Sequence, residues 1–252
     1  ICARYKISLI EDCAHTMGAK WDGKMSGSFG DVACFSTQTY KHINSGEGGL
    51  LVTPHKDIIT RAIIYSGSYM LYEKHYAAPE KEAFNEVKYN IPNYSGRMDN
   101  LRAAILLPQL KQLDQRCSDW NARYDSMNSI FKSSKHIKTI TRAEKEAFVA
   151  SSIQFSIPAF SYNDCKKLVA NCEAKGVSVK WFGDVEPSSY TSKYDSWHYL
   201  DKQPLLSSTE RVLATLIDIR IPLTFTISDC NKVANIVVNE IQELVQSPLE
   251  SR

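Results

Sequence analysis

A lysine in a polar loop, with acidic and hydroxyl side chains earlier in the same stretch, is the group in this sequence that could do chemistry. Lys41 lies between a short apolar segment and the glycine cluster at 46–49. An amine placed there could act as a Schiff-base nucleophile. Taken alone, the residue is explained equally well as a surface lysine. The case for chemistry therefore depends on its neighbours.

Two of those neighbours fall at the ends of predicted strands. Residues 7–10 are a short apolar run, consistent with a strand buried on both faces, and Asp12 follows it. Ser36 ends a second predicted strand at 32–36, and a third is expected at 50–53. Ligands of open α/β sheets gather at the carboxyl ends of strands, so Asp12 could face a site. A helix cap or loop acid is the alternative.

These side chains match the needs of pyridoxal phosphate (PLP). The cofactor requires a lysine amine for its Schiff base and a carboxylate that keeps its pyridine nitrogen protonated. It also requires hydroxyl or amide donors for its phosphate. Lys41, Asp12 and Ser36 are chemically suitable for these roles. The pattern therefore favours a PLP site.

The elements around these residues predict a mixed α/β fold. Asp22-Gly23 lies between β-compatible flanks, as in a two-residue hairpin turn, and a helix is expected over 56–64. From Asp99 to about residue 131, apolar residues recur on one helical face, and Pro108 should kink or break this helix. That face comprises Leu101, Ile105, Leu110, Leu113, Trp120, Tyr124, Met127 and Phe131.

A smaller α/β unit is expected after the long helix. Residues 152–157 alternate between apolar and polar, which predicts a half-buried strand, and 177–179 predict another. A helix should run from a cap at Asn163 to Gly176, and a last helix over 228–245. The predicted parts are 1–97 (large domain), 98–131 (linking helix) and 132–252 (small domain).

Composition excludes several classes of function. The 252 residues are 43% hydrophobic and 23% charged, with a net charge of +2 spread along the chain, so neither a nucleic-acid nor a membrane-surface footprint is indicated. No apolar run is long enough to cross a bilayer, and no signal segment opens the chain. The seven cysteines lack zinc spacing. A reducing, cytoplasmic protein without a structural metal is expected.

The order and spacing of the motifs resemble the sugar aminotransferases of the DegT/StrS type, a branch of the fold-type I PLP enzymes. The motifs are EDCAH at 11–15, GSFGD at 27–31, CFST at 34–37 with Lys41 five residues after Ser36, GEGG at 46–49, and the arginine-led segment from Gly96. The resemblance implies a partial large domain with a mostly parallel sheet, plus a small C-terminal α/β domain. The chain begins at Ile1 and lacks the family's N-terminal portion, so an N-terminally truncated fragment is expected.

The resemblance also implies roles for individual residues. Lys41 would form the Schiff base and carry protons, Asp12 would pair with the pyridinium nitrogen, and His15 would reach the ring hydroxyl. Ser36 would bind the phosphate, and Asn93 or Ser95 would reach the phosphate of a partner subunit. The residues expected to bind substrate are Arg97, Trp197, His198 and Tyr199. The last three lie in an aromatic, polar loop that suits a sugar or nucleotide, although a packed aromatic lid explains it equally well.

The function implied is transfer of an amino group from an amino acid, by analogy glutamate, to a keto or aldehyde sugar, often nucleotide-linked. Such reactions serve surface polysaccharide or amino-sugar biosynthesis, here in a homodimer with a shared active site. Members of the family that act as dehydratases replace the lysine with histidine; because Lys41 is kept, transamination is favoured. The alternative is a truncated, non-catalytic remnant or binding module without a complete cofactor site.

Overall fold

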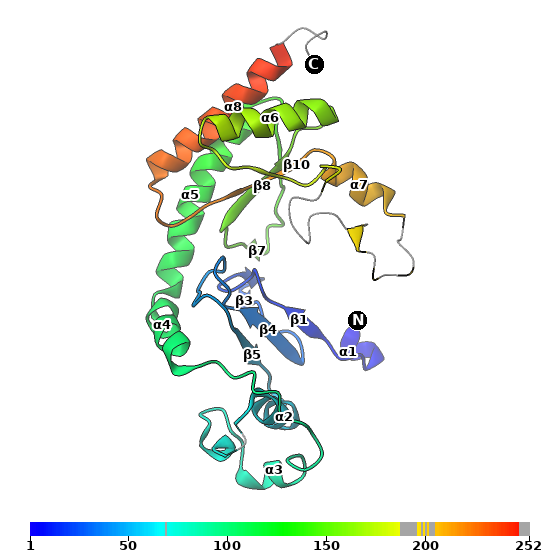
Figure 1. Ribbon diagram of the computed structural model, residues 1–252, viewed down its shortest axis with the longest axis vertical. Helices are drawn as coiled ribbons and strands as arrows, with labels where there is room; N and C mark the ends of the chain where they lie inside the picture. Colours follow the sequence, from blue (N-terminus) through cyan, green and yellow to red (C-terminus); the bar gives the residue numbers. More distant parts are fainter. Residues whose placement is uncertain (69, 187–195, 198, 200, 202–204, 247–252) are drawn as a thin grey trace. The chain divides into compact units, whose positions relative to one another are not determined.

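A computed structural model describes residues 1–68, 70–186, 196–197, 199, 201 and 205–246 (Figure 1). The chain divides into two compact units. The first is Ile1–Cys117 with Glu144–Val149, and the second is Ser118–Ala143 with Ala150–Arg252. The three-part division at 97 and 131 expected from the sequence stays a prediction.

The first unit is built on a three-stranded sheet in the order β1-β4-β5 (Figure 1). Strand β1 (Ile10–Asp12) runs parallel to β4 (Val32–Ser36), which pairs antiparallel with β5 (Gly49–Val52). The predicted strand at 7–10 was wrong in position and burial: pairing begins at Ile10, and Ile7 and Ile10 are exposed. Ile7 lies outside β1, and β1 is an edge strand of this sheet.

A hairpin precedes β4. Strands β2 (Lys20–Trp21) and β3 (Lys24–Met25) flank Asp22 and Gly23, which confirms the predicted turn. Both turn residues have positive φ, 51° and 76°, as the twist of a two-residue hairpin requires. Strand β7 (Glu146–Ala147) pairs with β2 and completes a second sheet.

The first unit also contains helices before and after this sheet. They are α1 (Cys2–Tyr5), α2 (Lys56–Ser66), the 3₁₀ helix η1 (Tyr72–Lys74), α3 (Lys81–Asn85) and α4 (Asn100–Lys111). Ile63 and Ile64 of α2 pack with the buried Phe84 of α3 into one apolar cluster. Helix α4 is capped by Asp99, whose carboxylate accepts the N–H of Arg102 at 2.8 Å.

The long helix expected from Asp99 is two helices, α4 and α5 (Leu113–Ser133). Pro108 lies inside α4, and the break comes at Gln112, whose N–H bonds to the carbonyl of Gln109 in a tighter final turn. In α4 the residues of the predicted apolar face, Leu101, Ile105 and Leu110, are exposed. The predicted face is confirmed in α5 for Trp120, Tyr124, Met127 and Phe131, which are buried.

The second unit holds a four-stranded antiparallel sheet in the order β6-β8-β10-β9. Its strands are β6 (Lys138–Thr139), β8 (Ser152–Ser156), β9 (Lys180–Trp181) and β10 (Leu216–Arg220). The alternation predicted for β8 is confirmed, since Ile153 and Phe155 are buried. The strand predicted at 177–179 was misplaced, because pairing with β10 begins only at Lys180.

Three helices complete this unit: α6 (Tyr162–Ala174), α7 (Ser207–Leu213) and α8 (Ile227–Gln246). Helix α6 is capped by Ser161 and not by the predicted Asn163, because Ser161 and Asp164 form a reciprocal capping box. The predicted last helix is confirmed as α8, which buries Val237, Ile241 and other apolar side chains. Among the described residues, no helix is long and apolar enough to span a membrane.

Candidate active site

The carboxyl ends of two parallel strands form one edge of the first sheet. Asp12 is the last residue of β1 and pairs in register with Cys34, while Ser36 is the last residue of β4. Since parallel strands end at the same edge, the structure brings these two residues together there. The chain then passes through Lys41 and returns as β5.

Lys41 contacts a histidine from the turn after β1. Its Nζ lies 2.7 Å from Nε2 of His15, and the Lys41 side chain is half-buried. A lysine ammonium has donors and no acceptor, so the amine donates to the imidazole. Sequence reasoning assigned His15 to the cofactor ring and did not foresee this contact, which joins residues 26 positions apart.

Local turns orient the carboxylate and the hydroxyl. Asp12 is exposed, and its Oδ1 accepts the N–H of Ala14 at 3.0 Å. The Oγ of Ser36 accepts the N–H of Gln38 at 3.3 Å. Both side chains are therefore tied to the turns that leave their strands, in the manner of Asx and ST turns.

Glu11 organises the loop between β3 and β4. Its carboxylate accepts backbone N–H groups from Gly27, Phe29 and Gly30 at 2.9, 2.7 and 2.6 Å. Partial desolvation works against ionisation, but the three donors and the charge of Lys24 leave the pKa of Glu11 below its usual value. Sequence reasoning missed this role; the signal was an acid beside Asp12 followed by a glycine-rich loop.

The loop that carries Lys41 is closed by backbone hydrogen bonds. The N–H of Thr37 bonds to the carbonyl of Gly48, and the N–H of Thr39 to that of Gly46, both at 2.9 Å. Gly48 has φ of 137°, and a Cβ there would lie 2.7 Å from the buried Oγ1 of Thr37. The backbone at this position therefore requires glycine.

His42, directly after Lys41, is buried, with 2% of its surface exposed. Burial, followed by the charges of His15, Lys41 and Arg116, lowers the pKa of His42 to about 4. The imidazole is therefore neutral at physiological pH. Its main-chain carbonyl accepts two bonds from Arg116, from Nε and Nη2, each at 3.2 Å.

A hydrogen bond to the end of α2 holds the segment that contains Asn93, Ser95 and Arg97. Asn93 Oδ1 accepts the N–H of Ser95 at 3.0 Å, and Ser95 adopts a positive φ of 52°. The guanidinium of Arg97 donates to the carbonyl of Gly67 at 2.8 Å. Their expected contacts with phosphate and substrate stay predictions.

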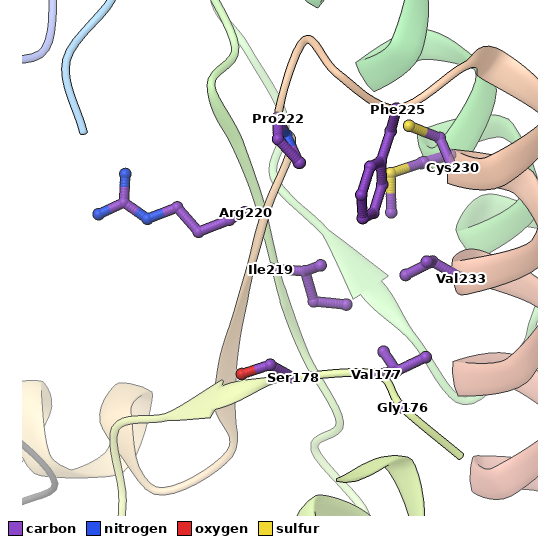
Figure 2. Close-up of a pocket in the computed structure, with 10 residues that line it drawn as sticks. Gly176, Val177, Ser178, Ile219, Arg220, Pro222, Phe225, Cys230 and Val233 are labelled. Carbon is purple, nitrogen blue, oxygen red and sulfur yellow. The ribbon is translucent and has the colours of Figure 1, made fainter. Parts of the chain in front are cut away.

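The aromatic loop belongs to the second unit. The rings of Trp197 and Tyr199 are stacked with centroids 6.2 Å apart, and His198 lies outside the described residues. A separate cavity of about 190 Å³ opens beside β10 and α8 (Figure 2). Met127, Val177, Ile219 and Phe225 contribute to its apolar lining. Of the predicted site residues that the structure describes, none is among those that line this cavity.

The fold is, in part, that of the fold-type I PLP aminotransferases. The aminotransferase TlmJ from Streptoalloteichus hindustanus matches 97% of the chain at a TM-score of 0.77 and 14% identity, and the chain covers 61% of it. The predicted fold class is thereby confirmed, with one parallel and one antiparallel pair in the described sheet around Lys41.

The family is shown by the sequence comparison. The model of the DegT/DnrJ/EryC1/StrS aminotransferase family matches residues 1–238, and the chain belongs to this family. GDP-perosamine synthase from Escherichia coli O157:H7 is 34% identical over 139 residues, which are 55% of this chain and 34% of that protein. L-glutamine:2-deoxy-scyllo-inosose aminotransferase from Streptoalloteichus tenebrarius is 32% identical over 116 residues, 46% of this chain and 27% of that protein. The matched segments thus span about a third of these relatives or less.

Proposed function

We propose that this chain carries the lysine-bearing part of a PLP-dependent sugar aminotransferase site. The observation that supports it most is the placement of Lys41 against His15 at the sheet edge where Asp12 and Ser36 end. An amine, a carboxylate, an imidazole and a hydroxyl converge on one edge. The amine, the carboxylate and the hydroxyl are the groups that PLP requires from a protein.

The residues present fit the cofactor. Bound PLP supplies an electron sink for a carbanion at the carbon that loses or gains the amino group. Lys41 would bind the carbonyl carbon of PLP and move protons. Asp12 would keep the ring nitrogen of PLP protonated. Ser36 would donate to the phosphate, and His15, which contacts the Lys41 amine, would orient that amine near the ring hydroxyl. Asn93 or Ser95 would serve the phosphate of a partner subunit.

The substrates follow from the family and from the names of relatives. We propose glutamate as the amino donor and a keto or aldehyde sugar, often nucleotide-linked, as the acceptor, in surface polysaccharide or amino-sugar biosynthesis. One relative is named for L-glutamine and another for GDP-perosamine, so glutamine is the donor to compare with glutamate. Arg97, Trp197, His198 and Tyr199 are the proposed substrate-binding residues.

We also propose a cytoplasmic homodimer with a shared active site. All seven cysteines are free thiols, as expected in a reducing compartment. The exposed leucines and isoleucine of α4, at 101, 105, 107 and 110, are 44 to 73% exposed and supply an apolar surface that a second subunit could bury. Sedimentation of wild type and of Leu101→Glu tests this: a monomeric wild type would contradict it.

The test of function measures the cofactor directly. The purified chain is mixed with PLP, and the visible absorbance of lysine-bound cofactor is recorded for wild type, Lys41→Ala and the matched control Lys20→Ala, an exposed lysine of β2. We expect the band in wild type and Lys20→Ala and its loss in Lys41→Ala.

Half-reactions then identify the donor. L-glutamate and L-glutamine are added separately, and the loss of the band is followed over time. A faster change with glutamine would correct the proposed donor without touching the enzyme class. Absence of any lysine-dependent band would support the remnant or binding module instead.

A further inference from the structure

Side chains on one face of helices α4 and α5 form hydrogen bonds with the main chain of the loop that carries Lys41. The amide of Gln109 exchanges two hydrogen bonds with the backbone of Asn44: Asn44 N–H donates to Oε1 at 3.1 Å, and Nε2 donates to the Asn44 carbonyl at 2.7 Å. Arg116 donates twice to the carbonyl of His42. Both neighbours of Ile43 are thus fixed by side chains more than 60 residues away in sequence.

An apolar contact lies between the hydrogen bonds made by Gln109 and those made by Arg116. Ile43 is 1% exposed and packs in a cluster with Met17 and Leu106, against which Leu113 also packs. The helix residues involved are 106, 109, 113 and 116, a spacing of three and four that places them on one helical face. The break at Gln112 does not disturb this alignment, since both sides of it contact the same short loop.

These contacts are suited to fixing a backbone. Amide and guanidinium groups are planar, so two hydrogen bonds from one group set an orientation as well as a distance. These hydrogen bonds are made to main-chain atoms, so they do not depend on which side chains the loop carries. The long Lys41 side chain rotates about several bonds. A fixed backbone reduces the range of positions that the Lys41 amine can adopt.

We propose that Gln109 and Arg116 are positioning residues that hold the backbone of residues 42–44 so that the Lys41 amine meets His15. Neither residue is assigned a contact with substrate or cofactor. The importance of this positioning for catalysis rests on the proposed function of Lys41. The hydrogen bonds from Gln109 and Arg116 are formed by the chain without cofactor.

Two variants, called the grip variants below, weaken the hydrogen bonds to the backbone of residues 42–44 with little change of side-chain volume. Gln109→Met removes the amide and keeps the length, and Arg116→Lys keeps the charge but loses the planar fork. Matched controls are Gln112→Met, on the exposed C-cap of α4, and Arg61→Lys, exposed on α2. Two measurements without cofactor are made: amide hydrogen exchange of residues 42–45, and the rate at which acetic anhydride acylates Lys41, read by peptide mass spectrometry.

We expect each grip variant to speed exchange of the loop about tenfold, as for loss of one or two hydrogen bonds, and to change the acylation rate of Lys41 relative to that of Lys20. The controls should match wild type in both. Unchanged exchange, or faster exchange with unchanged Lys41 acylation, would overturn the proposal. If a variant unfolds by circular dichroism, the remaining one decides, and Gln109→Glu, which keeps one acceptor, should restore part of the protection.

Cofactor binding separates this proposal from the proposed function. If wild type shows no lysine-dependent absorbance with PLP while the grip variants still alter Lys41 acylation, the function fails and the positioning role stands. If wild type binds PLP and the grip variants bind it with unchanged affinity and unchanged Lys41 acylation, the positioning role fails and the function stands.

Discussion

The amine of Lys41 and the imidazole of His15 meet at 2.7 Å across two loops that leave neighbouring parallel strands. His15 belongs to the turn after β1, and Lys41 to the loop after β4. The contact joins the loop after β4 to the turn after β1, the strand that ends at Asp12. The proposed role of His15 is to orient this amine for the cofactor.

Removing the imidazole tests that role. His15→Ala should weaken PLP binding about tenfold, because the proposed hydrogen bond to the ring hydroxyl is lost, and His15→Gln, whose amide can both donate and accept, should restore much of the affinity. Titration of the visible absorbance with PLP gives both dissociation constants. Equal affinity in wild type and His15→Ala would remove His15 from the site, and His75→Ala, an exposed histidine, is the control.

Asp12 is the proposed partner of the ring nitrogen. Asp12→Asn should lower turnover far more than cofactor occupancy, since a neutral amide cannot hold that nitrogen protonated. The amide oxygen can still accept the N–H of Ala14, so the turn is kept. Occupancy is read by absorbance, and turnover by release of the 2-oxo acid from the donor. Turnover equal to wild type would exclude Asp12 from this role.

The parts of the site that sequence predicts are those set by local pattern. A short apolar run located the strand end at Ser36 and another came within two residues of the end at Asp12, and a glycine cluster located the loop after Lys41, because strand period and turn chemistry depend on neighbouring residues. The placement of these residues at one edge followed from the parallel pairing that the resemblance implied.

The rest depends on tertiary contacts. Arg116 lies 74 residues from the carbonyl that it holds, and no periodicity reveals such a partner. In α4, helical spacing predicted an apolar face that the structure leaves exposed, while Leu106, off that predicted face, is buried against Ile43. At 177–179 the residues favour a strand, but register with β10 decides that pairing starts at Lys180.

Gly18 lies in close contact with Cys117. Its φ is +85°, and a Cβ would lie 2.5 Å from the Cys117 Sγ, so Gly18→Ala should destabilise the chain by about 2–4 kcal/mol through strain and overpacking. In the double variant with Cys117→Ala the steric part should vanish, leaving about 1–2 kcal/mol for the backbone. Urea unfolding of the four proteins gives the cycle. Additive costs would show that the two sites do not interact, and Gly23→Ala, with open space around it, isolates the cost of positive φ.

His42 should make stability depend on pH. Its pKa is about 4 in the folded chain against an ordinary value of 6.5, so protons bind the unfolded chain first as pH falls. The contribution to the free energy of unfolding is fully present above about pH 6.5 and is lost as the pH falls toward 4. Between pH 7 and 5, wild type should lose about 2 kcal/mol from this group. Urea unfolding at both pH values should show a loss smaller by about that amount in His42→Gln, and an unchanged loss in His75→Gln, whose ring is exposed. The same loss in His42→Gln as in wild type would mean that His42 is not held neutral.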